Sequence, residues 1–143
     1  MRACLSSAAA FVFVAATAAS VAAQAPGTAP PPATARADMV LREIVSGMPV
    51  GPRQEIRVLT ATLKPGDQTP FHTHRFPVTV YVFEGAFTLE VEGRPPVTVK
   101  AGQSMVEPAS VKMTGYNRSA TEPLRLVIFY VSDPDTPFLD PVR

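Results

Sequence analysis

The sequence predicts an all-β domain, and three observations indicate it. Short stretches rich in Val, Ile, Thr, Phe and Tyr recur about every 8 to 12 residues, with Gly and Pro between them. In the globular part of the chain, no window of about 11 residues shows helical apolar spacing without an interrupting Pro, Gly or β-branched run. Proline makes up 16 of the 143 residues, about twice its average usage, which argues against long helices. These features favour a barrel or a sandwich.

The N-terminal 23 residues have the layout of a signal peptide. A single Arg near the start is followed by an apolar run around residues 11–14 and then by small residues, with Val21 and Ala23 at the positions that precede cleavage. The run is too short, too rich in Ala and too often interrupted by polar residues for a membrane span. We therefore expect an exported protein, periplasmic or secreted, with no membrane anchor after cleavage of the signal.

Residues 24–37 are predicted to be a disordered linker rich in Pro and Ala. They contain four prolines and no aliphatic side chain larger than Ala, so they can bury little apolar surface. The domain itself is expected at residues 38–143, a length at which one hydrophobic core can be self-sufficient. Cys4 and Arg2 would leave with the signal peptide, so the mature chain would be free of thiols and formally neutral.

Turn residues separate the predicted strands in order along the domain. Residues 38–46 and residues 54–63 are the first two β-rich stretches, with two Gly and two Pro residues between them. The later predicted strands are short and punctuated in the same way, at residues 78–83, 87–91, 97–100, 105–106, 111–116 and 124–132. The tail after Asp133 is rich in proline, and we expect it to pack across the surface through Phe138 and Leu139.

Composition and motifs exclude several functions. The 13 Lys and Arg residues nearly balance the 12 Asp and Glu residues, and the scattered charges form no basic stripe for nucleic acid. There is no CxxC pair of a structural zinc finger, no GxSxG nucleophile elbow, and no phosphate-loop or dinucleotide-binding signature. We therefore expect a small-molecule ligand and no nucleic-acid partner.

The two histidines of the chain, His72 and His74, are candidate metal ligands. In an extended segment residues i and i+2 point to the same face, so both imidazoles can approach one metal ion. Two exposed histidines, or two core histidines bonded to carbonyl groups, would have the same spacing, and the motif alone does not separate these alternatives. By the same alternation, Arg75 is expected to face outward.

The spacing around the histidines resembles the first motif of the cupin superfamily. That motif consists of Gly, five residues, His-x-His, three or four residues, Glu, six residues and Gly. The matching positions here are Gly66, His72, His74 and Gly85, whereas Val78 stands where the motif has Glu. The resemblance thus retains two of the three first-motif ligands.

The second cupin motif has a partial counterpart later in the chain. Gly102, Pro108 and Asn117 match its Gly, Pro and Asn. Ser110 stands where the motif has its second Gly, and Met113 stands where it has a His. The second-motif ligand is therefore replaced by a thioether.

Residues 81–89, between the motifs, look like the hairpin that follows the first motif in this family. The whole resemblance covers residues 55–131 and implies a single cupin-type jelly-roll β-barrel. It is most similar to the small exported single-domain cupins of bacteria. Members of this superfamily commonly pair through an outer sheet, so a homodimer is also expected.

The departures from the motifs leave three alternatives for the site. In the first, the pocket holds a metal weakly or not at all, and apolar side chains fill the space of the lost ligands. In the second, a metal recruits a further ligand, for which Gln68 and Glu107 are the nearest oxygen donors, although we expect both to be solvated. In the third, His72, His74 and Met113 bind copper, because thioethers favour Cu(I).

We therefore predict a small-molecule-binding barrel with a partial metal site at His72 and His74, and with no assignable reaction. The alternative is a metal-dependent cupin enzyme, dioxygenase-like or isomerase-like, that uses both histidines and a non-standard ligand. The cofactor stays open between a divalent metal and copper, and no catalytic residue is assigned.

Overall fold

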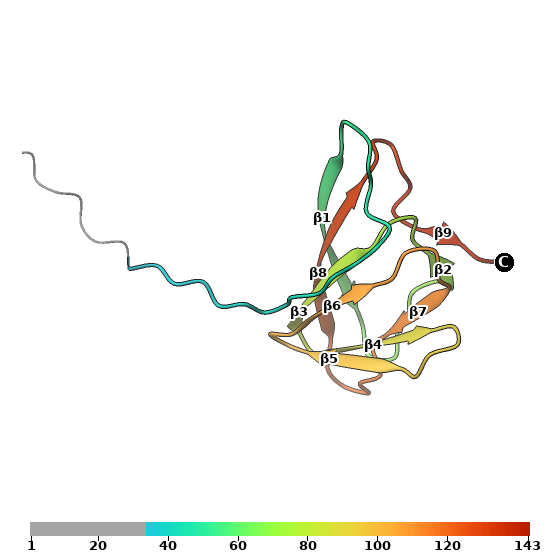
Figure 1. Ribbon diagram of the computed structural model, residues 1–143. Coiled ribbons are helices and arrows are strands. Elements are labelled where there is room, and N and C mark those ends of the chain that lie inside the picture. The colour runs from blue at the N-terminus through green and yellow to red at the C-terminus, as the bar shows by residue number, and fades with distance from the viewer. Residues whose placement is uncertain (1–33) are drawn as a thin grey trace, which may run out of the picture. The chain divides into compact units, whose positions relative to one another are not determined.

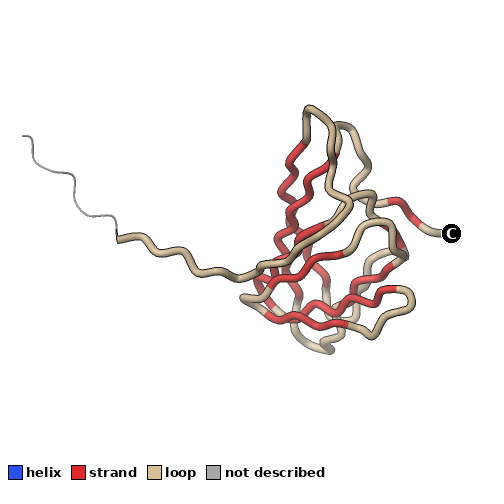
Figure 2. The backbone as a smooth tube through the Cα atoms, in the orientation of Figure 1, coloured by secondary structure: helices blue, strands red, loops and turns tan. Residues whose placement is uncertain are grey.

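The computed structural model describes residues 34–143, and each regular element in that range is a β-strand (Figure 1, Figure 2). The all-β prediction is confirmed. The predicted signal peptide and most of the predicted linker lie outside the described residues. Within the described part of the chain, no helix is long and apolar enough to cross a membrane. The strands are β1 (Glu55–Leu63), β2 (His72–Thr73), β3 (Val78–Glu84), β4 (Ala86–Val91), β5 (Val97–Lys100), β6 (Ser104–Glu107), β7 (Met113–Tyr116), β8 (Leu124–Ser132) and β9 (Asp140–Pro141).

The strands form two antiparallel sheets that share one apolar core. One sheet has the order β1-β8-β3-β6 and the other the order β5-β4-β7-β2-β9. Inward side chains of both sheets meet in the core, for example Val80 and Leu126 from the first sheet and Phe87 and Met113 from the second. Because both sheets keep free ends, strand pairing does not close the single barrel expected from the sequence. The arrangement is a two-sheet sandwich, as in a jelly roll.

Two predicted local features are wrong. Residues 38–46 form no strand: the segment pairs with no neighbouring strand, and Ile44 is 97% exposed, because β-branched residues alone do not make a strand without partners. The predicted hairpin at residues 81–89 is also absent, since β3 and β4 belong to different sheets. Gly85 alone separates them with φ of 81°, and a Cβ there would clash with the carbonyl oxygen of Pro123.

The C-terminal tail contributes a strand that the sequence did not predict. β9 pairs with β2, with His72 opposite Pro141 and Thr73 opposite Asp140. Phe138 packs against the core and does not merely cross the surface. A two-residue strand that contains proline has no alternation pattern to detect.

Ser110, which stands where the second motif has Gly, has a left-handed backbone conformation that favours glycine. Its φ is 58°, a value that costs a residue with a side chain roughly 1–2 kcal/mol relative to ordinary conformations. The Ser110 amide donates to the carbonyl oxygen of His74 at 2.7 Å. The strained residue therefore ties the loop after β6 to the histidine segment.

Replacing Ser110 with glycine is expected to stabilise the domain. Ser110→Gly relieves the strain but adds freedom to the unfolded chain, so the free energy of unfolding should rise by up to about 1 kcal/mol. Urea denaturation measures it. The neighbouring Ala109→Gly, at a residue without positive φ, is the control and should lower that free energy. A lower free energy of unfolding in Ser110→Gly would contradict the conclusion that the backbone of Ser110 is strained.

The outer face of the four-stranded sheet carries exposed apolar side chains. Ile56 and Val58 on β1 are 73% and 61% exposed, and Phe83 on β3 and Phe129 on β8 are 58% and 44% exposed. Large exposed apolar patches on a soluble domain are typical of interaction surfaces. The homodimer stays a prediction, and this face is where we expect it to form.

The dimer prediction is checked by solution mass. Light scattering should give twice the mass of the mature chain, and Ile56→Lys with Phe129→Lys should reduce it to one chain, because two buried charges would oppose the pairing of this face. A monomeric wild-type protein at micromolar concentration would rule the homodimer out.

Candidate metal centre

The segment around β2 brings the two histidines together in the interior. The Nε2 atoms of His72 and His74 lie 3.0 Å apart, and the two residues are 3% and 1% exposed. The predicted convergence of the two imidazoles is confirmed. Their role as metal ligands stays a prediction.

Glu107, at the end of β6, reaches the same point from the other sheet. Its Oε2 lies 3.0 Å from Nε2 of His74, and the residue is 6% exposed, so the expectation that Glu107 is solvated is wrong. In the β3–β6 ladder Glu107 stands directly opposite Val78. Side chains of such a pair point to the same face. A carboxylate therefore lies beside the histidines, and it comes from the strand that pairs with Val78.

Backbone carbonyl groups fix the tautomer of both imidazoles. His72 Nδ1 donates to the carbonyl oxygen of Pro70 at 2.7 Å, and His74 Nδ1 donates to that of Phe138 at 2.6 Å. A carbonyl oxygen only accepts, so the hydrogen of each neutral ring is on Nδ1 and each Nε2 is a bare acceptor. Burial lowers the pKa of His72, which favours the neutral ring that can bind a metal.

The three acceptor atoms face one another without a donor between them. His72, His74 and Glu107 each offer one such atom, and the three atoms lie within 4.8 Å of one another. A buried carboxylate next to two lone pairs is stable only with a cation, either a metal ion or a shared proton. Two imidazole nitrogens and one carboxylate oxygen are a common ligand set for zinc and non-haem iron. The residues present therefore fit a divalent metal.

The other sequence candidates have different positions. Met113 stands opposite His72 in the β2–β7 ladder and is fully buried, so its side chain lies on the same face as His72. Its role as a copper ligand stays a prediction. Gln68 is exposed, as expected for a turn residue. Arg75 faces outward, as predicted, and forms an ion pair with Asp140.

A small apolar cavity adjoins the three acceptors. Its volume is about 120 Å³, somewhat below that of an engineered apolar cavity that binds benzene, so it matches about four to six non-hydrogen atoms. His72, His74 and Glu107 contribute the polar part of its wall. The apolar part comes from both sheets and from the C-terminal tail, and includes Ala61, Leu63, Val80, Phe87, Leu126, Ile128, Phe138 and Leu139.

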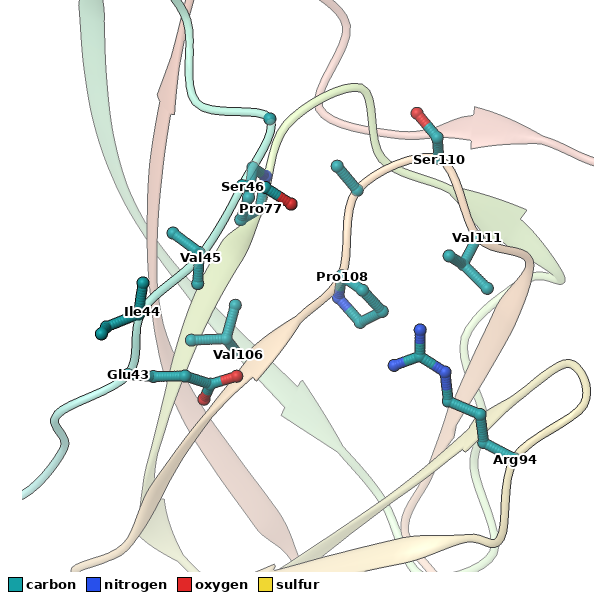
Figure 3. Close-up of a pocket in the computed structure, with 12 residues that line it drawn as sticks. Glu43, Ile44, Val45, Ser46, Pro77, Arg94, Val106, Pro108, Ser110 and Val111 are labelled. Atoms are coloured by element: carbon teal, nitrogen blue, oxygen red, sulfur yellow. The ribbon is translucent and has the colours of Figure 1, made fainter.

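A larger hollow lies outside the core, between residues 43–47 and the loop after β6 (Figure 3). It has a volume of about 420 Å³ and includes the exposed Ile44 and Arg94 in its wall. It contains none of the three convergent acceptors. Because a binding site is marked by convergent buried polar groups, the smaller cavity is the candidate site.

Comparisons with known proteins agree with the fold. A family model described as Cupin domain matches residues 59–130. The DMSP lyase DddQ from Ruegeria pomeroyi DSS-3 is similar with a TM-score of 0.53 and 18% identity over 61% of this chain and 43% of that chain. A cupin-like protein from Thermotoga maritima is similar with a TM-score of 0.52 and 20% identity over 61% and 64%. This chain therefore spans less than two thirds of either protein. No curated protein matches the sequence.

Single substitutions of the candidate ligand residues distinguish the possible ligand sets. Glu107→Gln keeps the shape but removes the charge, so the affinity for Zn²⁺ should fall by at least about 100-fold. Gln68→Ala, at an exposed site, should leave it unchanged. Met113→Leu should leave the Zn²⁺ affinity within a few-fold of the wild-type value. It should weaken Cu(I) binding only if the Met113 thioether binds copper. Isothermal titration measures each affinity, and equal Zn²⁺ binding by Glu107→Gln and wild type would exclude Glu107 as a ligand.

Proposed function

This chain belongs to the Cupin domain family, and we propose that it is an exported small-molecule-binding cupin whose divalent metal is held by His72, His74 and Glu107. The layout of residues 1–23 supports export. The metal would supply a Lewis-acid position at the wall of the small cavity. The chain's own residues supply the ligands, their orientation and the exclusion of water.

One observation carries this proposal: three buried acceptor atoms converge while the opposite nitrogen of each imidazole is occupied by a backbone carbonyl group. The Nε2 atoms of His72 and His74 are 3.0 Å apart, and Glu107 Oε2 is 3.0 Å from Nε2 of His74. Metal-binding histidines commonly donate their other ring N–H to a carbonyl or carboxylate, which fixes the ring and its tautomer. The site therefore has both the ligands of a metal centre and the contacts that orient them.

The cavity limits the ligand to a small molecule with an apolar part. Its volume of about 120 Å³ is below the range of about 300–1,000 Å³ typical of pockets for larger ligands. Away from the three acceptors, its wall is formed mostly by aliphatic and aromatic side chains. We therefore propose a ligand of about four to six non-hydrogen atoms, with one polar group that binds the metal and an apolar remainder.

Metal binding should stabilise the folded protein. A metal ion at a free concentration of 100 times its Kd stabilises the native state by about 2.7 kcal/mol, which raises the Tm of a domain of this size by roughly 10 °C. Differential scanning calorimetry with Zn²⁺, Mn²⁺, Fe²⁺ or Ni²⁺ measures this shift. A chelator should reverse it, and His72→Ala with His74→Ala should abolish it. The absence of any shift in the wild type would mean that a proton, and not a metal, occupies the site.

A metal-dependent enzyme is the second candidate, and the ligand count favours it. Catalytic metal sites commonly have three protein ligands and keep at least one position open for water or substrate. Two histidines and one carboxylate also form the ligand set of non-haem iron oxygenases. Conversion of a small molecule by the metal-loaded wild type, with none by Glu107→Gln, would distinguish an enzyme from a binding protein.

A further inference from the structure

The C-terminal tail returns to lie beside the histidine segment. β9 pairs with β2, and the two strands lie next to each other close to the C-terminus (Figure 1). The amide of Val142 also donates to the carbonyl oxygen of Phe71 at 2.9 Å. The last residues of the chain therefore form part of the sheet that carries His72.

Phe138 on this tail contacts His74 in two ways. Its carbonyl oxygen accepts the Nδ1 hydrogen of His74 at 2.6 Å, and its ring packs against the imidazole with centroids 4.9 Å apart. Phe138 and Leu139 also line the small cavity. Displacement of the tail would therefore free His74 to rotate and would open the cavity to water.

An ion pair on the outer surface fixes the tail to the histidine segment. Arg75 Nε lies 2.9 Å from Asp140 Oδ2, and the second Arg75 nitrogen lies 3.0 Å from Oδ1, so the pair is bidentate. Asp140 stands opposite Thr73, and alternation places Thr73 and Arg75 on the face opposite to the histidines. The pair is thus close to the site in sequence but does not touch the cavity.

From this geometry we infer that Arg75 and Asp140 are positioning residues for the metal centre. They hold the tail in the position at which the Phe138 carbonyl group orients His74. The inference rests on the proposed function, because it assigns the tail a role in metal binding. The group that directly orients His74 is the Phe138 carbonyl, and loss of such a contact typically weakens metal affinity by 10 to 100-fold. The exposed ion pair only holds this group in place, so its loss should have a smaller effect.

The test compares two ion pairs of equal exposure. Side chains of Arg75 and Asp140 are 54% and 39% exposed, and those of Arg118 and Glu90 are 55% and 39% exposed. Asp140→Asn and Arg75→Gln should each raise the Kd for Zn²⁺ by about two- to five-fold, because an exposed ion pair holds the tail only weakly. The control Arg118→Gln should leave that Kd unchanged, while the Tm of the metal-free protein changes by a similar small amount in all three variants.

Two further measurements keep the inference separate from the proposed function. Exchange of the two charges, Arg75→Asp with Asp140→Arg, should restore much of the Zn²⁺ affinity. In the metal-free protein, NMR should detect a slowly exchanging Nδ1 hydrogen on His74 that is lost in Asp140→Asn but kept in Arg118→Gln.

Three outcomes decide the matter. Unchanged Zn²⁺ affinity in Asp140→Asn overturns the positioning role. An equal loss of affinity in Arg118→Gln also overturns it, because the effect would then be general. If the wild type binds no metal, the proposed function fails, and the NMR signal of the His74 Nδ1 hydrogen decides the inference. Survival of this signal in Asp140→Asn overturns the inference. Its loss in Asp140→Asn supports the conclusion that the ion pair keeps the tail against His74.

Discussion

The hydrogen bonds from the Nδ1 atoms of His72 and His74 to the carbonyl oxygens of Pro70 and Phe138 set the chemistry of the interior. They leave each Nε2 without a hydrogen and aim both toward Glu107. Without these carbonyl partners either ring could carry its hydrogen on Nε2 and donate to the carboxylate, and the cluster would be an ordinary buried hydrogen-bond network. The carbonyl groups thus distinguish a cation site from a polar patch in the core.

The three acceptors come from both sheets, which couples the candidate site to the fold. His72 belongs to β2 in the five-stranded sheet, and Glu107 ends β6 in the four-stranded sheet. A cation bound between them, as proposed, would link the two layers, so part of its binding free energy would be folding free energy. The loop after β6 is held in turn by the bond from the Ser110 amide to the carbonyl oxygen of His74. Backbone contacts on both sides therefore limit the freedom of the three acceptors.

The sequence predicts the parts that depend on local pattern. Alternation and turn residues predict most strands, β8 among them with its observed bounds, and the i, i+2 spacing predicts that His72 and His74 converge. Glu107 is named only as one possible further ligand and is expected to be solvated, because a carboxylate at a strand end before proline resembles a solvated residue. Only the register that pairs it with Val78, far away in the sequence, reveals its direction. β9 is missed because pairing with β2, and not its own composition, makes it a strand.

The first motif has a Glu where this chain has Val78, and here a Glu stands on the paired strand at residue 107. This difference changes the candidate site less than the loss of a motif residue suggests. Paired residues on adjacent strands have Cβ atoms about 5 Å apart and share a face, so a Glu side chain that starts from the neighbouring strand can reach the same region. Val78 then fills the core at the vacated position, where it is fully buried. Met113 similarly occupies the space of the second-motif histidine, opposite His72. Both replacements make the surroundings of the acceptors more apolar, which strengthens the attraction of the single carboxylate for a cation.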